Sequence, residues 1–167
     1  MSNVIYLICS LPSLTFGQVP PISFKAFLHE ANSQLSAKNR KKLESIDIRE
    51  MLMNTEKGEL KSFIDLLANI QEDISELRQA KANKRNPNLV KLSNSIVDKN
   101  PLEREIQIMK WQWEELTSIE SINTFTLTEV MVYKLKLQIL LRLHSFNAEK
   151  GAHVRASIVN SIKKEEA

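Results

Sequence analysis

The fold is decided by residues 100–146, which read NPLEREIQIMKWQWEELTSIESINTFTLTEVMVYKLKLQILLRLHSF. Asn100 is a capping residue, Pro101 takes the first helical position and Glu103 takes the third, a combination typical of a helix start. The apolar residues that follow are spaced by four, three, four and three positions, which places them on one helix face: Leu102, Ile106, Met109, Trp113 and Leu116.

The second half of this stretch predicts a helix that is apolar on nearly every side. Thr126 and Glu129 form a second capping box, and the helix runs from there to about Phe146. A helix without a polar face has to be enclosed by other helices. Neither helix of residues 100–146 carries a recognisable set of catalytic side chains, so the stretch indicates a helical protein that packs and docks.

The prolines set the fold class for the rest of the chain. Residues 22–86 and 102–167 contain no proline, as long helices require. The five prolines lie in the first 21 residues or on either side of one connection: Pro12, Pro20, Pro21, Pro87 and Pro101. We therefore predict an all-α multi-helix bundle of about five to six helices, with a short extended N-terminal segment.

The N-terminal part predicts one short apolar segment and two short helical regions. Residues 4–9 form a β-prone run, for which we favour a buried extended segment over a short helix. Cys9 would then lie in the core. Ser23 and Ser36 can cap the helices that follow, and whether residues 36–53 form one helix or two stays open.

The most regular helical pattern follows these short segments. Its apolar residues step by three and four positions and predict one seam of a bundle helix: Leu60, Phe63, Leu67, Ile70, Ile74 and Leu77. Near the other end of the chain, Asn147 can cap a last helix whose apolar residues recur every four positions: Val154, Ile158 and Ile162.

We expect a single domain over residues 1–167, because this length suits one core. It divides into an N-terminal helical part (1–82), a linker (83–99) and a C-terminal three-helix part (100–167). The linker breaks the helical pattern and has room for one helical turn. Long connections are uncommon in compact domains unless they are flexible or functional, so the linker is the best candidate for a hinge or for a segment that orders on binding.

The net charge is only +3, but the basic residues are unevenly spread. Residues 81–100 carry five Lys or Arg against one Asp or Glu. Together with a second cluster they supply the cations of a candidate partner interface: Lys38, Arg40, Lys41, Lys42, Lys84 and Arg85. Two interpretations stay open, namely a solvated surface and a dock for an acidic partner or for phosphates.

Trp111 completes the candidate interface. Residues two positions apart on a helix point about 200° apart, so Trp111 and Trp113 cannot both face one core. Trp113 lies on the seam of the first helix and is expected in the core. Trp111 lies either on a second buried face near Ile108, which we favour, or at the surface as an interface anchor.

The residue types that carry chemistry are dispersed along the chain. The histidines lie far apart in the sequence, and none has the spacing of a zinc or di-iron site: His29, His144 and His153. Three scattered glycines cannot form a phosphate-binding loop. We therefore expect no enzyme, no cofactor and no metal.

The expected location follows from the cysteine and from the most apolar helix. A single cysteine forms no intramolecular disulfide, which indicates a reducing compartment. Residues 127–143 contain Lys134, Lys136 and Arg142, so this helix is not a membrane span. The chain is expected to be soluble and cytoplasmic, without direct membrane insertion.

Four stretches carry a family resemblance: residues 6–14 (YLICSLPSL), 20–28 (PPISFKAFL), 100–105 (NPLERE) and 136–142 (KLQILLR). They resemble an uncharacterised bacterial family that is encoded beside the subunits of V/A-type ATPases. The resemblance implies a non-catalytic accessory or structural subunit, peripheral to the inner membrane through the ATPase complex. Its partners would be central-stalk, catalytic-head or rotor-ring subunits. It would stand in for the all-helical connector between the central stalk and the membrane rotor ring.

Two alternatives to this expectation are kept. The first is an unrelated helical adaptor or self-associating module that uses the 60–77 or the 102–116 seam as a helix-in-groove surface. The second is a nucleic-acid binder acting through residues 38–42 and 81–85, which would bind in a strongly salt-dependent manner. We expect no nucleic-acid partner.

Overall fold

The computed structural model describes residues 3–53 and 58–146. Within these ranges the chain forms six α-helices and no strand, which confirms the all-α prediction. The helices are α1 (Val4–Ser10), α2 (Phe24–Gln34), α3 (Ala37–Glu44), α4 (Lys61–Ala82), α5 (Pro101–Ile122) and α6 (Leu127–Ser145). Three 3₁₀ turns lie between them: Met51–Met53, Gly58–Leu60 and Asn94–Ile96. The predicted helix after Asn147 lies outside the described residues.

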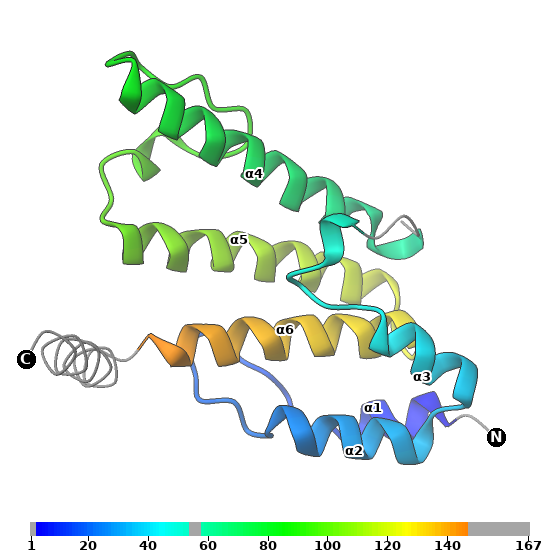
Figure 1. The fold of residues 1–167 in the computed structure, drawn as a ribbon. Helices are drawn as coiled ribbons and strands as arrows, with labels where there is room; N and C mark the ends of the chain where they lie inside the picture. Colours follow the sequence, from blue (N-terminus) through cyan, green and yellow to red (C-terminus); the bar gives the residue numbers. More distant parts are fainter. Residues whose placement is uncertain (1–2, 54–57, 147–167) are drawn as a thin grey trace, which may run out of the picture.

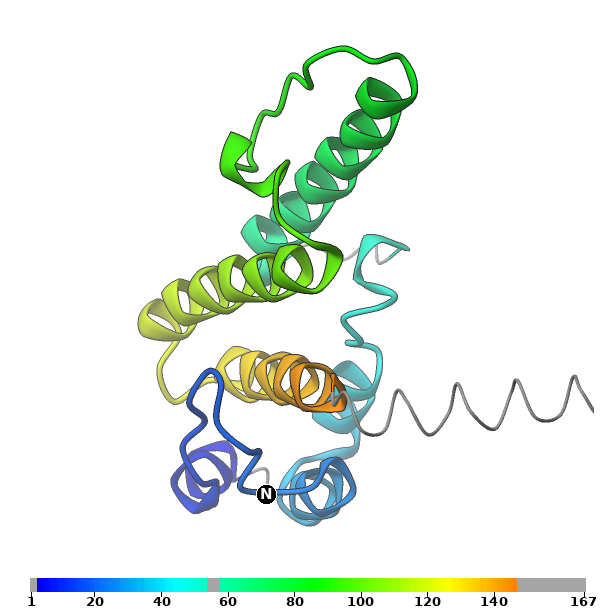
Figure 2. The ribbon, with the colours of Figure 1, turned by 90° about the vertical axis from the view of Figure 1, so that its left-hand side faces the viewer.

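The helices stack in tiers, as Figure 1 shows: α4 lies above α5, α5 above α6, and α1 with α2 below α6. Figure 2 shows the same order from another side, with α3 beside α6. Helices α5 and α6 form an antiparallel pair joined by the short corner 123–126. The N-terminal helices α1–α3 and helix α4 therefore lie on opposite sides of the α5–α6 pair.

Helix α6 contributes to two separate clusters of buried apolar side chains, which explains its all-round hydrophobicity. Val132, Leu135 and Ile139 belong to the cluster shared with α4 and α5. Val130 and Leu137 belong to the cluster shared with α1, α2 and α3. All five are at most 1% exposed. The prediction that other helices must enclose this one is confirmed.

The two predicted helix starts differ in how they are capped. Asn100 Oδ1 accepts a hydrogen bond from the Glu103 amide at 2.8 Å, as the sequence indicates. At the start of α6, the Thr126 hydroxyl donates to the Asn123 carbonyl, and no side-chain cap forms. Glu129 instead accepts from the Phe125 amide, one residue earlier than in a capping box. The helix start is confirmed, but the capping-box geometry is wrong.

The N-terminal segment is a helix, so the prediction of an extended segment is wrong. Asn3 caps α1 by accepting from the Tyr6 amide at 3.0 Å. Leu7 is fully buried in the cluster with α2 and α6, and this packing outweighs the β-propensity of the segment. Cys9 faces the other side of the helix and is exposed, so its predicted core position is also wrong.

The two predicted seams have different outcomes. In the 60–77 seam, every member except the half-buried Ile74 is at most 9% exposed. In the 102–116 seam, Met109 and Leu116 are buried, whereas Leu102 is 48% exposed. Trp113 is half-buried, because it packs at the edge of the core and not within it.

Residues 83–99 form a strap that is fastened to α4. The buried carboxylate of Asp73 accepts from the amides of Val90, Lys91 and Leu92 at 2.9, 2.7 and 2.7 Å. Farther along the strap, Leu92 and Ile96 are 4% and 0% exposed in the α4–α5 core. The strap therefore has its own core residues, in addition to the single 3₁₀ turn that the sequence leaves room for.

A second carboxylate of α4 holds the start of the strap. Glu76 forms a two-pronged ion pair with Arg85, with N···O distances of 2.5 and 2.8 Å, and accepts from the Asn88 amide at 3.0 Å. At the other end, the Arg104 guanidinium donates to the carbonyls of Ile96, Val97 and Lys99. The two arginines therefore fix the strap between α4 and α5.

These contacts shift both carboxyl groups. Burial alone would raise the pKa of Asp73, but the three backbone amides outweigh it and the pKa is lowered. The Arg85 guanidinium, together with the Asn88 amide, lowers the pKa of Glu76 to about 2. Both groups are therefore ionised at neutral pH, in the form that accepts the hydrogen bonds of the strap.

We expect Asp73→Asn to lower the free energy of unfolding by about 2–3 kcal/mol, because an amide cannot accept from three backbone donors and brings its own N–H groups toward them. Urea unfolding followed by circular dichroism measures the loss. Glu72→Gln, on the exposed face of the same helix, is the matched control and should change stability by less than about 0.5 kcal/mol. Equal stability of the two variants would contradict this account of the strap.

The Glu76 contacts should be lost only in strong acid. A carboxyl group with a lowered folded-state pKa stabilises the fold above its ordinary pKa of 4.5, and this contribution disappears as the pH falls toward about 2. In an NMR titration, the Asn88 amide signal should therefore move with a midpoint near 2. A midpoint near 4.5, or the same movement in Glu76→Gln, would show that Glu76 does not hold this amide.

Candidate functional site

The first predicted basic cluster lies on α3. Lys38, Lys41 and Lys42 are exposed, and their side-chain ammonium groups make no hydrogen bond or ion pair with other described residues. Arg40 is half-buried and donates to the Asn32 carbonyl at 3.4 Å, which ties α3 to α2. Three of the four predicted cations are therefore available to a partner, and one helps hold the fold.

The second predicted cluster lies at the end of α4, far from α3 in both ribbon views (Figures 1 and 2). Lys84 is exposed in a left-handed backbone conformation, with φ of 52°, two residues after the end of the helix. Arg85 is occupied by its ion pair with Glu76. The structure does not bring the two clusters together, so the predicted interface divides into an α3 end and an α4 end.

Trp111 belongs to neither end. It is half-buried against the α4–α5 core and lines a shallow cavity of about 350 Å³ with Leu66, Lys91 and Glu114. Its ring therefore contributes to packing between α4, the strap and α5 while one edge meets solvent. Trp111 is therefore partly buried by packing and partly exposed at the surface, so both alternatives left open by the sequence apply in part.

A groove of about 540 Å³ lies between α4, the strap and α5. We call it the α4–α5 groove. Its floor is formed by half-buried and buried apolar side chains: Ile74, Leu77, Ala80, Pro87, Val97 and Ile108. Its lining contains four cations, Arg78, Lys81, Arg85 and Arg104, but only one anion, Glu105. Glu105 is itself paired with Arg142 at 2.6 Å.

The cations of this groove have different tasks. Arg85 and Arg104 hold the strap, as described above. Arg78 and Lys81 are exposed, and their side chains have no hydrogen-bond or ion-pair partner among the described residues. Neither residue stands out in the sequence, because both belong to a regular helix, where charged residues are usually a solvated face.

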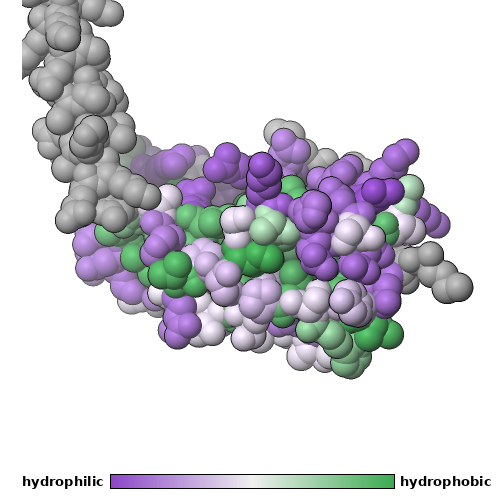
Figure 3. Space-filling view, turned by 90° about the horizontal axis from the view of Figure 1, so that it is seen from below, coloured by the Kyte–Doolittle hydropathy of each residue, from purple (hydrophilic) through white to green (hydrophobic). Residues whose placement is uncertain are grey.

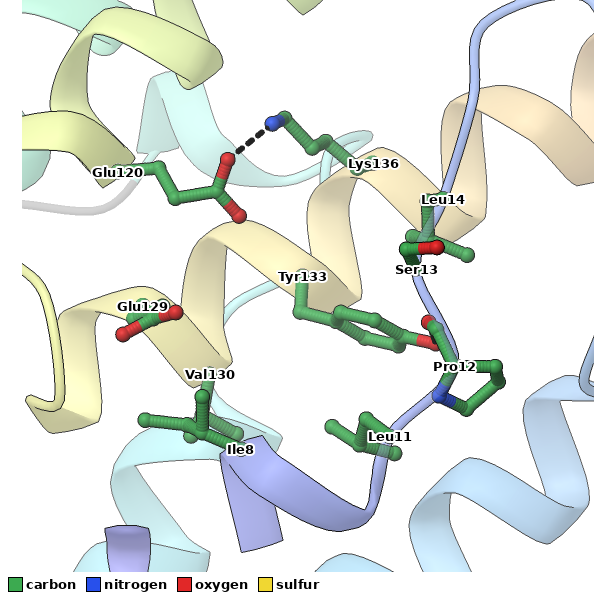
Figure 4. Close-up of a pocket in the computed structure, with 10 residues that line it drawn as sticks. All are labelled: Ile8, Leu11, Pro12, Ser13, Leu14, Glu120, Glu129, Val130, Tyr133 and Lys136. Atoms are coloured by element: carbon green, nitrogen blue, oxygen red, sulfur yellow. Dashed lines mark hydrogen bonds and ion pairs between the residues drawn. The ribbon is translucent and has the colours of Figure 1, made fainter.

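A second pocket lies at the corner where α1, α5 and α6 meet, as the close-up in Figure 4 shows. It has a volume of about 290 Å³ and is lined on one side by Ile8, Leu11 and Leu14. Its other side carries the polar groups of α5 and α6, among them Glu120, Tyr133 and Lys136. These polar groups bind one another or the backbone.

Lys136 is the most buried charged group of this corner, at 5% exposure. Its ammonium lies 2.5 Å from Glu120 Oε2 and 5.1 Å from the centroid of the Trp113 ring. Trp113 in turn meets the Phe16 ring edge-on at a centroid distance of 5.6 Å. The ion pair and the cation–π contact compensate the buried charge and join α5 to α6.

Two further polar side chains of α6 bind segments far away in the sequence. The Tyr133 hydroxyl donates to the Pro12 carbonyl at 2.8 Å, and burial raises the pKa of Tyr133 to about 12. Lys134 donates to the Leu43 carbonyl at 2.8 Å, at the end of α3. Burial lowers the pKa of Lys134, although Asp47 and Glu44 oppose the shift.

Gln138 completes this set from the next turn of α6. Its amide oxygen accepts from the Ile48 amide at 3.1 Å, and its amide nitrogen donates to Asp47 Oδ2 at 2.8 Å. In the sequence, the lysines of this helix serve only to exclude a membrane span. A lysine inside an otherwise apolar helix is a signal for a buried partner, but the partner itself lies about 90 residues away and leaves no local pattern.

The described residues contain no group of three or more His, Cys, Asp or Glu side chains that could hold a metal ion. His29 and His144 are both exposed on helices, and His153 lies outside the described part of the chain. None of the helices α1–α6 has the length and hydropathy needed to cross a membrane.

The outer face of α1 is apolar and has no covering element within the described residues. Ile5 and Tyr6 are 57% and 55% exposed, next to the exposed Cys9. Figure 3, which views the molecule from below, shows apolar surface gathered at the end of this face where α1 lies. Exposed apolar surface of this kind is a candidate contact region.

Comparison with known proteins finds a similarity to one family model. Residues 84–166 match the model of a family described as a protein of unknown function (DUF2764). The match includes the strap from Lys84, α5 and α6, and its description names neither an activity nor an ATPase. No curated protein and no solved structure matches the chain.

We expect Glu120→Gln to lower the free energy of unfolding by about 1–2 kcal/mol, because the Lys136 ammonium would stay buried without its counter-charge. Chemical unfolding followed by the fluorescence of the two tryptophans measures this. Glu114→Gln, on the exposed side of α5, is the matched control and should behave like the unsubstituted protein. If Glu120→Gln is as stable as the control, the ion pair does not stabilise the corner.

Proposed function

We propose that this chain is a non-catalytic structural or accessory subunit of a bacterial V/A-type ATPase that translocates protons or sodium ions. The observation that carries the proposal concerns cationic side chains without a partner among the described residues, which lie at two opposite ends of the packed helices, the α3 end and the α4 end. A connector has to contact two bodies, and two separate docking surfaces suit that task.

The cations at these ends are suited to docking because they do little for the fold. Exposed lysines contribute little to stability even when they are paired. They do attract and orient an acidic partner, and they lose this effect as the salt concentration rises. The resemblance of residues 6–14, 20–28, 100–105 and 136–142 to a family encoded beside V/A-type ATPase subunits supplies the identity of the complex.

The position within the complex is the second part of the proposal. The chain acts as the connector between the central stalk and the membrane rotor, with stalk, catalytic-head or rotor-ring subunits as its partners. It is cytoplasmic and is held at the inner membrane by the complex, without inserting into the bilayer. It binds no nucleic acid and needs no cofactor.

An unrelated helical adaptor or self-associating module is the alternative. The exposed apolar face of α1, with Ile5 and Tyr6, favours it because such a face can pack against a second protein or a second copy. The 60–77 seam does not serve this alternative, since it is buried inside the molecule.

The proposal is tested by an affinity purification of the tagged chain from its native cells, with crosslinking and mass spectrometry. We expect catalytic-head and central-stalk subunits to be recovered. Replacing Lys38, Lys41 and Lys42 by Glu should remove the crosslinks of the α3 end and leave those of the α4 end. The matched control, Lys25→Glu with Lys110→Glu, changes exposed lysines outside both ends and should retain all crosslinks.

Two outcomes would contradict the proposal. Recovery of the chain alone, or of partners unrelated to the ATPase, would refute the ATPase role, and recovery of the chain alone would favour self-association. Recovery of ATPase subunits with unchanged crosslinks in the α3 variant would show that the basic ends do not provide the contacts.

A further inference from the structure

The α4–α5 groove combines an apolar floor with a basic rim. Ile74, Pro87 and Val97 are half-buried, so each presents part of its apolar surface to the groove. Leu102, which follows the lining residue Pro101, is 48% exposed and adds apolar surface at the start of α5. A partner that fills this groove must therefore bring apolar side chains of its own.

The free charge of the groove lies along one line of α4. Ile74, Arg78 and Lys81 follow each other at spacings of four and three residues, which keeps them on one side of the helix. The part of α4 from Ile74 to Lys81 extends over about 10 Å, or roughly two turns, and the helix ends one residue later at Ala82. The rim is thus long enough to run beside a short helix of a partner.

The free cations on this rim are not needed to hold the molecule together. The ion pairs and hydrogen bonds of the strap use Arg85 and Arg104, and Glu105 is occupied by Arg142. Arg78 and Lys81 have no such partner in the described part of the chain. An occupant that carries carboxylates beside its apolar side chains would supply the missing counter-charges.

The shape of the charge distribution favours a peptide over a nucleic acid. A phosphodiester backbone would bind the rim but would leave the apolar floor without a partner. An amphipathic helix suits both the apolar floor and the basic rim, because its apolar face covers the floor while carboxylates on its edge reach Arg78 and Lys81. The corner pocket has the opposite balance, with Glu120 and Glu129 against Lys136 alone, and does not select such a helix.

We propose that the α4–α5 groove is a docking site for an acidic amphipathic helix of a partner protein. The partner helix lies along α4 between that helix, the strap and α5. This proposal rests on the proposed function, in which the α4 end is one of two docking surfaces, and it names the chemistry of the partner that binds there. The site is defined by the groove itself, so synthetic peptides test it independently of the ATPase.

The probe is a synthetic helical peptide of about 18 residues, with Leu at every third and fourth position and Glu along one edge of the leucine face. Its affinity for the full chain is measured by fluorescence anisotropy at about 50 mM salt, where exposed charges are weakly screened. We expect binding that weakens as salt is added. We also expect NMR shifts confined to the groove, including the amides of Ile74 and Val97.

Substitutions identify the site. Arg78→Glu with Lys81→Glu should weaken binding of the acidic peptide by about tenfold or more, because attraction at the rim becomes repulsion. Both residues are exposed, so the fold should be kept, which circular dichroism checks. Lys41→Glu with Lys42→Glu makes a matched charge change on α3 and should leave the affinity unchanged. A peptide with Lys in place of Glu should bind the unsubstituted protein at least about tenfold more weakly than the acidic peptide.

Four results would overturn the proposal: no binding of the acidic peptide, equal binding by the two charge variants, equal binding of the acidic and basic peptides, or shifts outside the groove. Tighter binding of a single-stranded RNA that is lost in the Arg78/Lys81 variant would assign the rim to nucleic acid. Self-association that the same variant abolishes, without binding of the peptide, would assign it to a second copy. Binding of the peptide without any ATPase subunit in the affinity purification would keep this site and refute the proposed function.

Discussion

The structure depends on the burial of α6 on all sides. A helix with this composition cannot face water, so the chain has to place helices against it from both directions, and the two apolar clusters are the result. Four side chains of α6 then use their polar groups to bind other segments of the chain, and we call these contacts tethers. Tyr133 binds the loop before α2, Lys134 binds the end of α3, Lys136 binds α5 and Gln138 binds the turn after α3. Each tether satisfies a group that would be costly to bury alone.

The far side of the molecule is held by a different device. Helix α4 contacts α5 directly, but of the strap that joins them only Leu92 and Ile96 are fully buried in the core. Two carboxylates of α4 compensate for this by binding backbone amides of the strap, three at Asp73 and one at Glu76. Backbone groups that would otherwise need solvent or secondary structure are satisfied by side chains. This arrangement keeps the strap as a fixed wall of the α4–α5 groove.

The sequence predicts those elements whose cause is local. Asn100 and Pro101 mark the start of α5, and the spacing of Leu60 to Leu77 identifies the buried face of α4, because capping and periodicity act within a few residues. The helical state of α1 was not predictable in this way, since the packing of Leu7 against distant helices decides it. The Gln138 and Tyr133 tethers join residues 90 to 121 positions apart, so one sequence carries no pattern that identifies their partners.

A single sequence also does not show which basic residues are paired within the chain. This pairing decides which of them are available for docking. In the sequence, Arg40, Arg85 and Lys42 are equivalent members of basic clusters. In the structure, Arg40 and Arg85 hold backbone and carboxylate groups of their own chain, whereas the Lys42 ammonium has no partner among the described residues. Arg78 and Lys81, which the sequence does not single out, line the groove. A cation can attract a partner strongly only if its own chain has left it without a counter-charge, so docking is expected at the α3 end and at the groove rim, and not along the linker as a whole.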